Sequence, residues 1–260
     1  MPDYLDVAAA RDQKGLRLVL TAGVPGPWGE AAKGLFYTKG IDYAAVRQDG
    51  GGENAELAAW TGQANAPQAI YEDEPARSGW AEILLLAERL APEPSLIPSD
   101  PQQRAMMFGL LFEIAGETGL GWCRRLMMID PGLRLPPDAL GPMREIFERL
   151  GNRYGYSPEA AERAEQRVVE ILHLLADQWQ RQREAGRRFL LGDRLSAVDV
   201  YWAAFAALLS PLPPELCPMP EMLRQQYGAI GPPVKAALDP ALLEHRDTIY
   251  RDFLQLPLDF

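Results

Sequence analysis

β-type and helical segments alternate over residues 16–90, and the alternation ends at a proline-rich linker. Residues 16–21 and 41–46 have the composition of strands. A helix that begins at Pro27 and ends at Lys39-Gly40 separates them. Proline suits the first turn of a helix, whereas glycine accepts the left-handed backbone that often follows the last turn. A strand, a helix and a strand in this order predict an α/β domain with at least one parallel crossover.

The stretch from Asn65 to Leu84 supplies a third strand and the helix that follows it. Pro67 stands at the strand entrance, where its missing N–H costs no ladder hydrogen bond, and X-Pro bonds become cis at low cost. An acidic turn closes a hairpin, and Ser78 then occupies an N-cap position before apolar residues at helical spacing. Because a helix start carries unpaired N–H groups and partial positive charge, it can receive a carboxylate. Taken alone, the motif favours a capped strand–turn–helix without a ligand.

Pro92, Pro94 and Pro98 mark a linker, after which no segment reads as a strand. Helical spacing of apolar residues follows instead, and residues 200–209 are apolar on all sides, as in a helix at the centre of a bundle. The sequence therefore predicts an N-terminal extension over residues 1–14, an α/β domain over 15–91, a linker over 92–99 and an all-helical domain over 98–260, with a last helix over 240–254.

Acidic residues outnumber basic ones by 36 to 26, which gives a net charge of −10. No basic excess is present to displace counterions from phosphates or to bind an anionic membrane, so we expect no nucleic-acid or membrane partner. Two cysteines are too few for a disulfide framework, and no apolar run approaches the ~20 residues of a membrane span. We therefore expect a soluble cytoplasmic protein.

Three separate sequence motifs support the same interpretation of the whole chain. Lys39-Gly40-Ile41-Asp42-Tyr43 lies between the first helix and the second strand, and Ala66-Pro67 is followed eleven residues later by Arg77-Ser78. The third motif, residues 192–199, ends in Ser196 and Asp199 with the spacing of a capping box. Together these motifs resemble the glutathione S-transferase superfamily, and the resemblance covers nearly the whole chain. It implies a thioredoxin-like α/β domain, an all-α C-terminal domain and a homodimer.

The resemblance also implies a glutathione site. The backbone of Ala66, before a cis Pro67, would pair with the cysteinyl backbone of glutathione. Ser78 and its helix N-terminus would hold the γ-glutamyl carboxylate. Arg77 stands where the family has an acidic residue, so it would repel the γ-glutamyl ammonium unless Glu74 or a partner subunit compensates.

The family activates the thiol with a hydroxyl or uses a cysteine near the first helix, since a hydrogen bond to sulfur favours the thiolate. Ala22 and Gly26 hold those positions here, and Thr21, as a neighbouring strand residue, should face the other way. The backbone N–H groups of Trp28 and Gly29 remain as candidate donors. Two functions stay open: a slow or atypical transferase that conjugates glutathione to a small apolar electrophile, and a non-catalytic binding or interaction protein that keeps the fold.

An apolar pocket for the electrophile would involve Met106, Met107 and Leu111, although the same pattern suits core or subunit contacts. The other candidates suggest no further chemistry. His173 and His245 lie far apart without cysteine spacing, so no metal site is expected. We expect His173 in the core or at its boundary and His245 in solvent.

Cys123 lies beside Arg124 and Arg125, whose charges could lower the pKa of its thiol. An ordinary helical cysteine explains the same residues, and we favour that interpretation.

Overall fold

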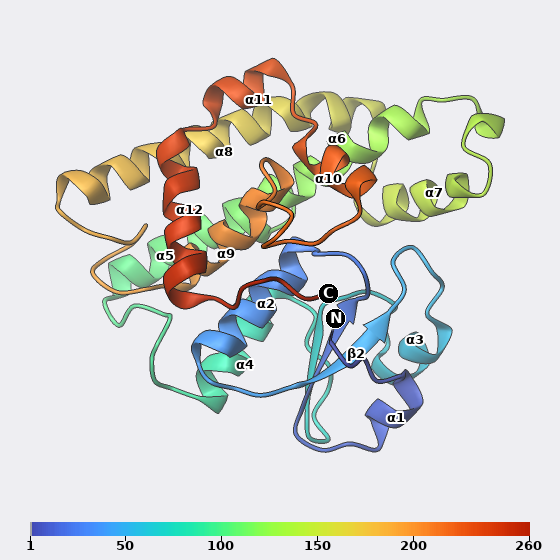
Figure 1. Ribbon diagram of the computed structural model, residues 1–260, viewed down its shortest axis with the longest axis horizontal. Helices are drawn as coiled ribbons and strands as arrows, with labels where there is room; N and C mark the ends of the chain where they lie inside the picture. The colour runs from blue at the N-terminus through green and yellow to red at the C-terminus, as the bar shows by residue number, and fades with distance from the viewer. Residues whose placement is uncertain (1) are drawn as a thin grey trace.

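A computed structural model describes residues 2–260 as a small mixed sheet with helices on both faces, joined to a larger helical part (Figure 1). The strands are β1 (Leu16–Thr21), β2 (Ala44–Gln48) and β3 (Gln68–Tyr71), in the order β2-β1-β3. β1 pairs with β2 in parallel and with β3 antiparallel. Helix α2 (Pro27–Thr38) makes the parallel crossover, and α3 (Ala55–Thr61) precedes β3. The predicted α/β fold with one parallel crossover is confirmed.

Both faces of the sheet are buried, which explains why β1 is apolar at nearly every position. Leu18 and Leu20 face α2 and the helical part, where they join the main core. Val19 faces the other way, into a smaller core with Val46 and Leu57 of α3. α2 therefore lies between the sheet and the helical part, with contacts to both α4 and α9.

The expected hairpin after β3 is reduced to a single antiparallel bridge between Ala69 and Arg77. Each residue donates its N–H to the carbonyl of the other, at 2.8 and 2.9 Å. Pro75 lacks an N–H and so cannot extend the ladder. Helix α4 (Trp80–Leu90) then begins with Gly79 as its N-cap, so the expectation that Ser78 caps this helix is wrong by one residue.

Residues 2–14, expected as an extension, are integrated into the sheet edge. Leu5 forms a parallel bridge with Val46, its N–H donating to Ala45 O at 2.9 Å and its carbonyl accepting from Arg47 N–H at 3.0 Å. The short helix α1 (Val7–Arg11) follows and packs on α3 and β2. The outer edge of β2 is therefore partly covered by the chain's own backbone.

The rest of the described chain, from residue 91 onward, contains helices and no strand. The helices are α5 (Pro101–Ala115), α6 (Leu120–Leu133), α7 (Met143–Arg153), α8 (Pro158–Glu184), α9 (Ala197–Phe205), α10 (Glu221–Gly228), α11 (Pro232–Ala237) and α12 (Pro240–Phe253), with 3₁₀ turns η1 (Pro137–Ala139) and η2 (Ala206–Leu208). Every residue of α9 is buried, as predicted for the centre of the bundle. No helix among residues 2–260 is long and apolar enough to cross a bilayer.

The carboxylate of Asp199 organises the start of α9. It accepts hydrogen bonds from the N–H of Leu190 at 2.8 Å, and from the N–H and hydroxyl of Ser196 at 2.9 Å each. His245 of α12 completes the cluster with Nε2 at 2.9 Å from Oδ1 of Asp199. The expectation of a solvated His245 is therefore wrong, because the packing of α12 on α9 buries it. His173, expected in the core or at its boundary, is instead exposed on α8.

Candidate functional site

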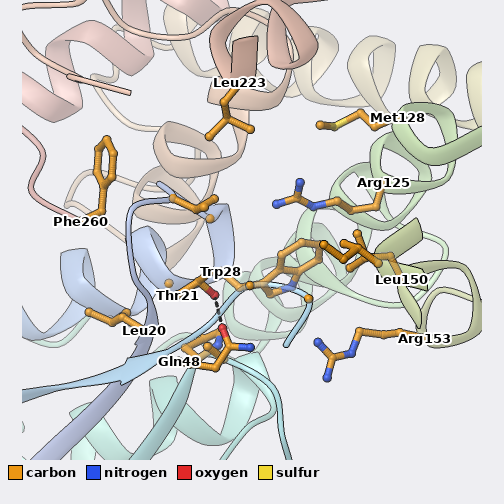
Figure 2. A pocket seen from close by; sticks show the side chains of 18 of the residues that line it. Leu20, Thr21, Trp28, Gln48, Arg125, Met128, Leu150, Arg153, Leu223 and Phe260 are labelled. Carbon is orange, nitrogen blue, oxygen red and sulfur yellow. Dashed lines mark hydrogen bonds between the residues drawn. The ribbon is translucent and has the colours of Figure 1, made fainter. Parts of the chain in front are cut away.

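A cavity of about 350 Å³ opens between the α/β part and the helical part (Figure 2). Its lower wall comes from the ends of β1 and β2, the start of α2 and the turn before β3. Its upper wall comes from α6, α7 and α10. The lining includes Tyr4, Leu20, Thr21, Trp28, Gly29, Gln48, Gly51, Ala66, Pro67, Arg125, Ile129, Phe147, Leu150, Arg153, Tyr154, Leu223 and Phe260.

The turn before β3 presents an open backbone edge to the cavity. The peptide bond between Ala66 and Pro67 is cis. Gln68 donates from Nε2 to the carbonyl of Asn65 at 2.6 Å, and Gln48 holds the carbonyl of Ala64 at 3.3 Å. Neither the N–H nor the carbonyl of Ala66 has a partner among the described residues. This edge can therefore pair with an extended, peptide-like ligand.

Arg77 and Ser78 lie outside the lining of this cavity. Arg77 donates to the carboxylate of Glu74 at 2.6 Å, and Arg89 donates to the same carboxylate at 2.6 Å. Hydrogen bonds from Arg89 and then Arg77 lower the pKa of Glu74. The charge of Arg77 is thus compensated within its own turn, and its side chain does not fill the cavity. The Ser78 hydroxyl makes no hydrogen bond within the described chain, so it is free to serve a ligand.

The start of α2 places two backbone donors at the cavity. Gly26 is the N-cap and carries no side chain that could cap the helix. The N–H groups of Trp28 and Gly29 accordingly have no partner in the described structure, and both residues line the cavity. The indole of Trp28 donates to the carbonyl of Ala115 at 2.9 Å and packs edge-on against Phe205, with ring centroids 4.9 Å apart. The indole N–H is therefore already used, and the backbone N–H of Trp28 is its remaining free donor.

Three residues with hydroxyl groups, Tyr4, Thr21 and Tyr154, line the cavity, and none of them was expected there from the sequence. Thr21 was expected to face away, but it is the last residue of β1, where strand alternation no longer fixes the side-chain direction. Its hydroxyl donates to Oε1 of Gln48 at 2.7 Å (Figure 2). Tyr4 reaches the cavity from the N-terminal segment, and its hydroxyl is buried without a partner in the described structure. Burial raises the pKa of Tyr4 to about 12, so it is a hydrogen-bond donor at neutral pH.

Helices α6 and α7 supply an apolar wall with two arginines. Ile129, Phe147 and Leu150 form part of the apolar surface, and Arg125 and Arg153 point into the cavity beside it (Figure 2). No local sequence signal distinguishes these arginines from others on the same helices, because their role depends on how α6 and α7 face the sheet.

The three residues expected to form an apolar pocket lie elsewhere. Met107 and Leu111 are fully buried, and Met106 is 41% exposed. None of them lines the cavity. Helix α5, which carries all three, turns its apolar face toward α9, so the cavity is bounded by α6 and α7 instead.

The glycine-rich loop after β2 lies directly under α7. A Cβ atom on Gly51 would lie 2.7 Å from Cγ2 of Ile146, and Gly51 has a φ of +76°. The loop is braced by Asn54, whose side chain accepts from the N–H of Asp49 at 2.9 Å and donates to its carbonyl at 3.0 Å. Only a residue without a side chain permits this approach of loop and helix.

Neither cysteine belongs to the cavity. Burial raises the pKa of Cys123 to about 11, and this effect outweighs the nearby cation of Arg167. Burial likewise raises the pKa of Cys217 to about 11. Residues 2–260 contain no group of three side chains placed to hold a metal ion.

Comparisons with known proteins agree with this architecture. Residues 158–245 match the family model described as the glutathione S-transferase C-terminal domain. A glutathione S-transferase of Methylobacterium radiotolerans, in complex with glutathione sulfonate, is 15% identical with a TM-score of 0.58, and the alignment covers 92% of each chain. A rice glutathione S-transferase in complex with glutathione is 18% identical with a TM-score of 0.60, over 95% of this chain and 94% of the rice chain.

The omega-class transferase 3C of Trametes versicolor is 15% identical with a TM-score of 0.55, over 95% of this chain and 84% of its own. No curated protein sequence matches the chain. At such identities the structural likeness establishes the fold, and the activity must be argued from the site.

Proposed function

We propose that this chain is a member of the glutathione S-transferase superfamily and that its cavity binds glutathione and conjugates the thiol to a small apolar electrophile. The observation that carries the proposal is the unpaired backbone edge of Ala66, in the same cavity as the free N–H groups of Trp28 and Gly29. The glutathione and glutathione sulfonate held by similar structures support the choice of ligand.

In this proposal the cysteinyl backbone of glutathione pairs with the N–H and carbonyl of Ala66, as a short added strand. The γ-glutamyl end extends past the cavity lining to Ser78, whose hydroxyl is free. Arg77 departs from the family pattern, but its pairing with Glu74 presents the γ-glutamyl ammonium with an ion pair instead of an isolated cation.

The thiol sulfur is then directed toward the start of α2. The N–H groups of Trp28 and Gly29, with the partial positive charge of the helix end, favour the thiolate over the thiol. Tyr4 is a further donor in the cavity, since its hydroxyl is protonated at neutral pH and unpartnered in the described structure. The thiolate attacks the electrophile, a sulfur–carbon bond forms, the leaving group departs with its electron pair, and the thiol proton passes to water.

One observation favours a second function. Ala22 and Gly26 occupy the positions at which the superfamily carries its activating side chain, and neither can donate through a side chain. Binding without turnover is therefore the alternative, as in a carrier or interaction protein. We further propose, from the resemblance, that the protein is a cytoplasmic homodimer, which light scattering after size-exclusion chromatography would test for oligomeric state.

Calorimetric titration with glutathione tests the proposal. Ser78→Ala should weaken binding about tenfold, because it removes a hydrogen bond to a carboxylate. Ser99→Ala is the matched control, since Ser99 is exposed and lies outside the cavity. No binding by the wild type at millimolar glutathione, or equal binding by both variants, would contradict the assigned site.

Turnover of 1-chloro-2,4-dinitrobenzene separates the two functions. A transferase should conjugate it, and Tyr4→Phe should lower kcat if the hydroxyl assists the thiolate. Tight glutathione binding without turnover across aryl halides, epoxides and enones would establish the binding protein instead.

A further inference from the structure

Two guanidinium groups enter the cavity from neighbouring helices, Arg125 from α6 and Arg153 from the last turn of α7 (Figure 2). The polar partners of Arg125 are two phenol groups: the hydroxyl of Tyr227 at 3.3 Å, with the guanidinium 5.5 Å from the centre of that ring, and the hydroxyl of Tyr154, which lines the cavity. Arg153 has no hydrogen bond or ion pair within residues 2–260. Neither arginine is paired with a carboxylate of the described chain.

Three arginines on or next to these helices are held by the protein, whereas Arg149 of α7 is exposed and has no partner within the described residues. Arg134 pairs with Asp130 at 2.8 Å, and Arg144 pairs with Glu148 at 2.6 Å. Arg124, adjacent to Arg125 in sequence, is buried and donates to backbone carbonyls, including that of Leu208 at 3.0 Å.

The chain carries a net charge of −10, so carboxylates are not scarce. Arg125 is half-buried without a carboxylate, and Arg153, which is exposed, lines the same cavity, so together they make this part of the cavity suitable for an anion supplied by a ligand.

The rest of the lining does not cancel this positive charge. Glu30 is the one acidic residue among the described lining residues, and Lys33 lies 3.2 Å from its carboxylate. Lys33 also pairs with Asp259 at 2.9 Å. Glu30 is thus already engaged with Lys33, and it cannot also neutralise both Arg125 and Arg153.

The surface beside the two arginines is apolar, with Met128, Ile129 and Phe147 among its residues. Guanidinium groups bind carboxylates through parallel hydrogen bonds, and a flat apolar body can pack beside them. We propose that the second ligand of this cavity is an aromatic or otherwise apolar carboxylate, with its carboxylate at Arg125 and Arg153 and its body against α6 and α7. The assignment of this carboxylate as a substrate rests on the proposed function. Its binding at the two arginines does not require that function.

A matched pair of probes tests the proposal: 4-chloro-3-nitrobenzoate and its methyl ester, which share the reacting carbon and differ in the charge. In turnover the thiolate sulfur bonds to the ring carbon, the carbon–chlorine bond breaks, chloride leaves with the electron pair, and the thiol proton goes to water. Binding of each probe is measured by calorimetry without glutathione. With glutathione, kcat/KM for each probe is divided by the rate constant of its uncatalysed reaction with the thiol, because the ester group activates the ring more than the carboxylate does. The wild type should prefer the acid to the ester by about a hundredfold, because two guanidinium groups each contribute about tenfold.

Arg125→Gln and Arg153→Gln should each reduce this acid-to-ester ratio about tenfold, and the double variant should abolish it. Arg149→Gln is the matched control, since Arg149 is exposed one turn earlier on α7 and does not line the cavity. Arg125→Lys keeps the charge and should retain part of the preference, which guards against a folding defect in the glutamine variant. Circular dichroism verifies the fold of each variant.

Equal binding of acid and ester, or a ratio that the glutamine variants do not change, would overturn the inference. It would also be overturned if both variants weakened glutathione binding and left the acid-to-ester ratio intact, because the arginines would then serve the tripeptide. A preference for the acid in a protein that does not bind glutathione would sustain the inference and refute the proposed function alone.

Discussion

Replacing Asp199 with asparagine removes one negative charge from the centre of the helical part while keeping the size of the side chain. Each carboxylate oxygen serves two donors: Oδ1 contacts Leu190 N–H at 2.8 Å and His245 Nε2 at 2.9 Å, and Oδ2 accepts twice from Ser196. The asparagine amide can replace only one of these oxygens. Whichever way it turns, a buried backbone N–H of Leu190 or Ser196 faces an NH₂ group.

The cost follows from these contacts. An unsatisfied buried N–H costs about 1–3 kcal/mol, and the remaining bonds lose their charge assistance, so we expect a total loss of roughly 2–4 kcal/mol. That is a large part of the stability of an ordinary domain, and it corresponds to a fall in melting temperature on the order of 10 °C. Chemical denaturation and differential scanning calorimetry measure both quantities.

Asp193→Asn is the control, because Asp193 lies in the loop just before α9, is exposed, and pairs within the described residues only with Arg187, at 3.1 Å. An exposed pair of this kind contributes about 0–1 kcal/mol, so the control should stay close to the wild type. Equal losses in Asp199→Asn and Asp193→Asn would refute the reasoning, since the buried hydrogen bonds would then contribute nothing beyond surface charge.

Gly51→Ala should lose about 3 kcal/mol and loosen the contact of the loop with α7, because the new methyl would lie 2.7 Å from Ile146 at a φ of +76°. Gly23→Ala, at a φ of +73° with no atom within 4 Å, should lose only about 1–2 kcal/mol, and equal losses in the two variants would show that the clash is relieved freely. Burial raises the pKa of both Cys123 and Cys217 to about 11, so at pH 8 roughly one thiol in a thousand is ionised. Both should react slowly with Ellman's reagent until the protein unfolds, and rapid reaction of one thiol in the native protein would contradict its burial.

Local signals were sufficient to predict the α/β part. Pro27 and Gly40 mark the ends of α2 through backbone conformations that depend on their own side chains, and Gly40 has a φ of +62° in the structure. The capping box of Ser196 and Asp199 is local in the same sense and forms as the sequence predicts. Helix α6 has no comparable local signal, because its N-cap is Gly119 and Pro131 lies inside it.

The contents of the cavity depended on contacts between distant segments. Tyr4 reaches the cavity because Leu5 pairs with Val46. No pattern within residues 1–14 predicts that bridge. Arg124 and Arg125 are neighbours in sequence, yet one is held by carbonyls and the other faces the cavity, which depends on how α6 packs against the segments that contain Leu208 and Tyr227. His245 was misplaced for the same reason, since its burial depends on how α12 packs on α9.

The walls of the cavity come from both the sheet and the helical part, so ligand binding in the cavity is coupled to the association of these two parts. A molecule that binds only when these parts are in contact shifts the unfolding equilibrium by RT ln(1 + [L]/Kd), about 2.7 kcal/mol at one hundred times its dissociation constant. Thermal-shift screening can therefore rank glutathione analogues and aromatic acids without any turnover. Two such compounds that bind opposite walls should raise the melting temperature together by more than either does alone.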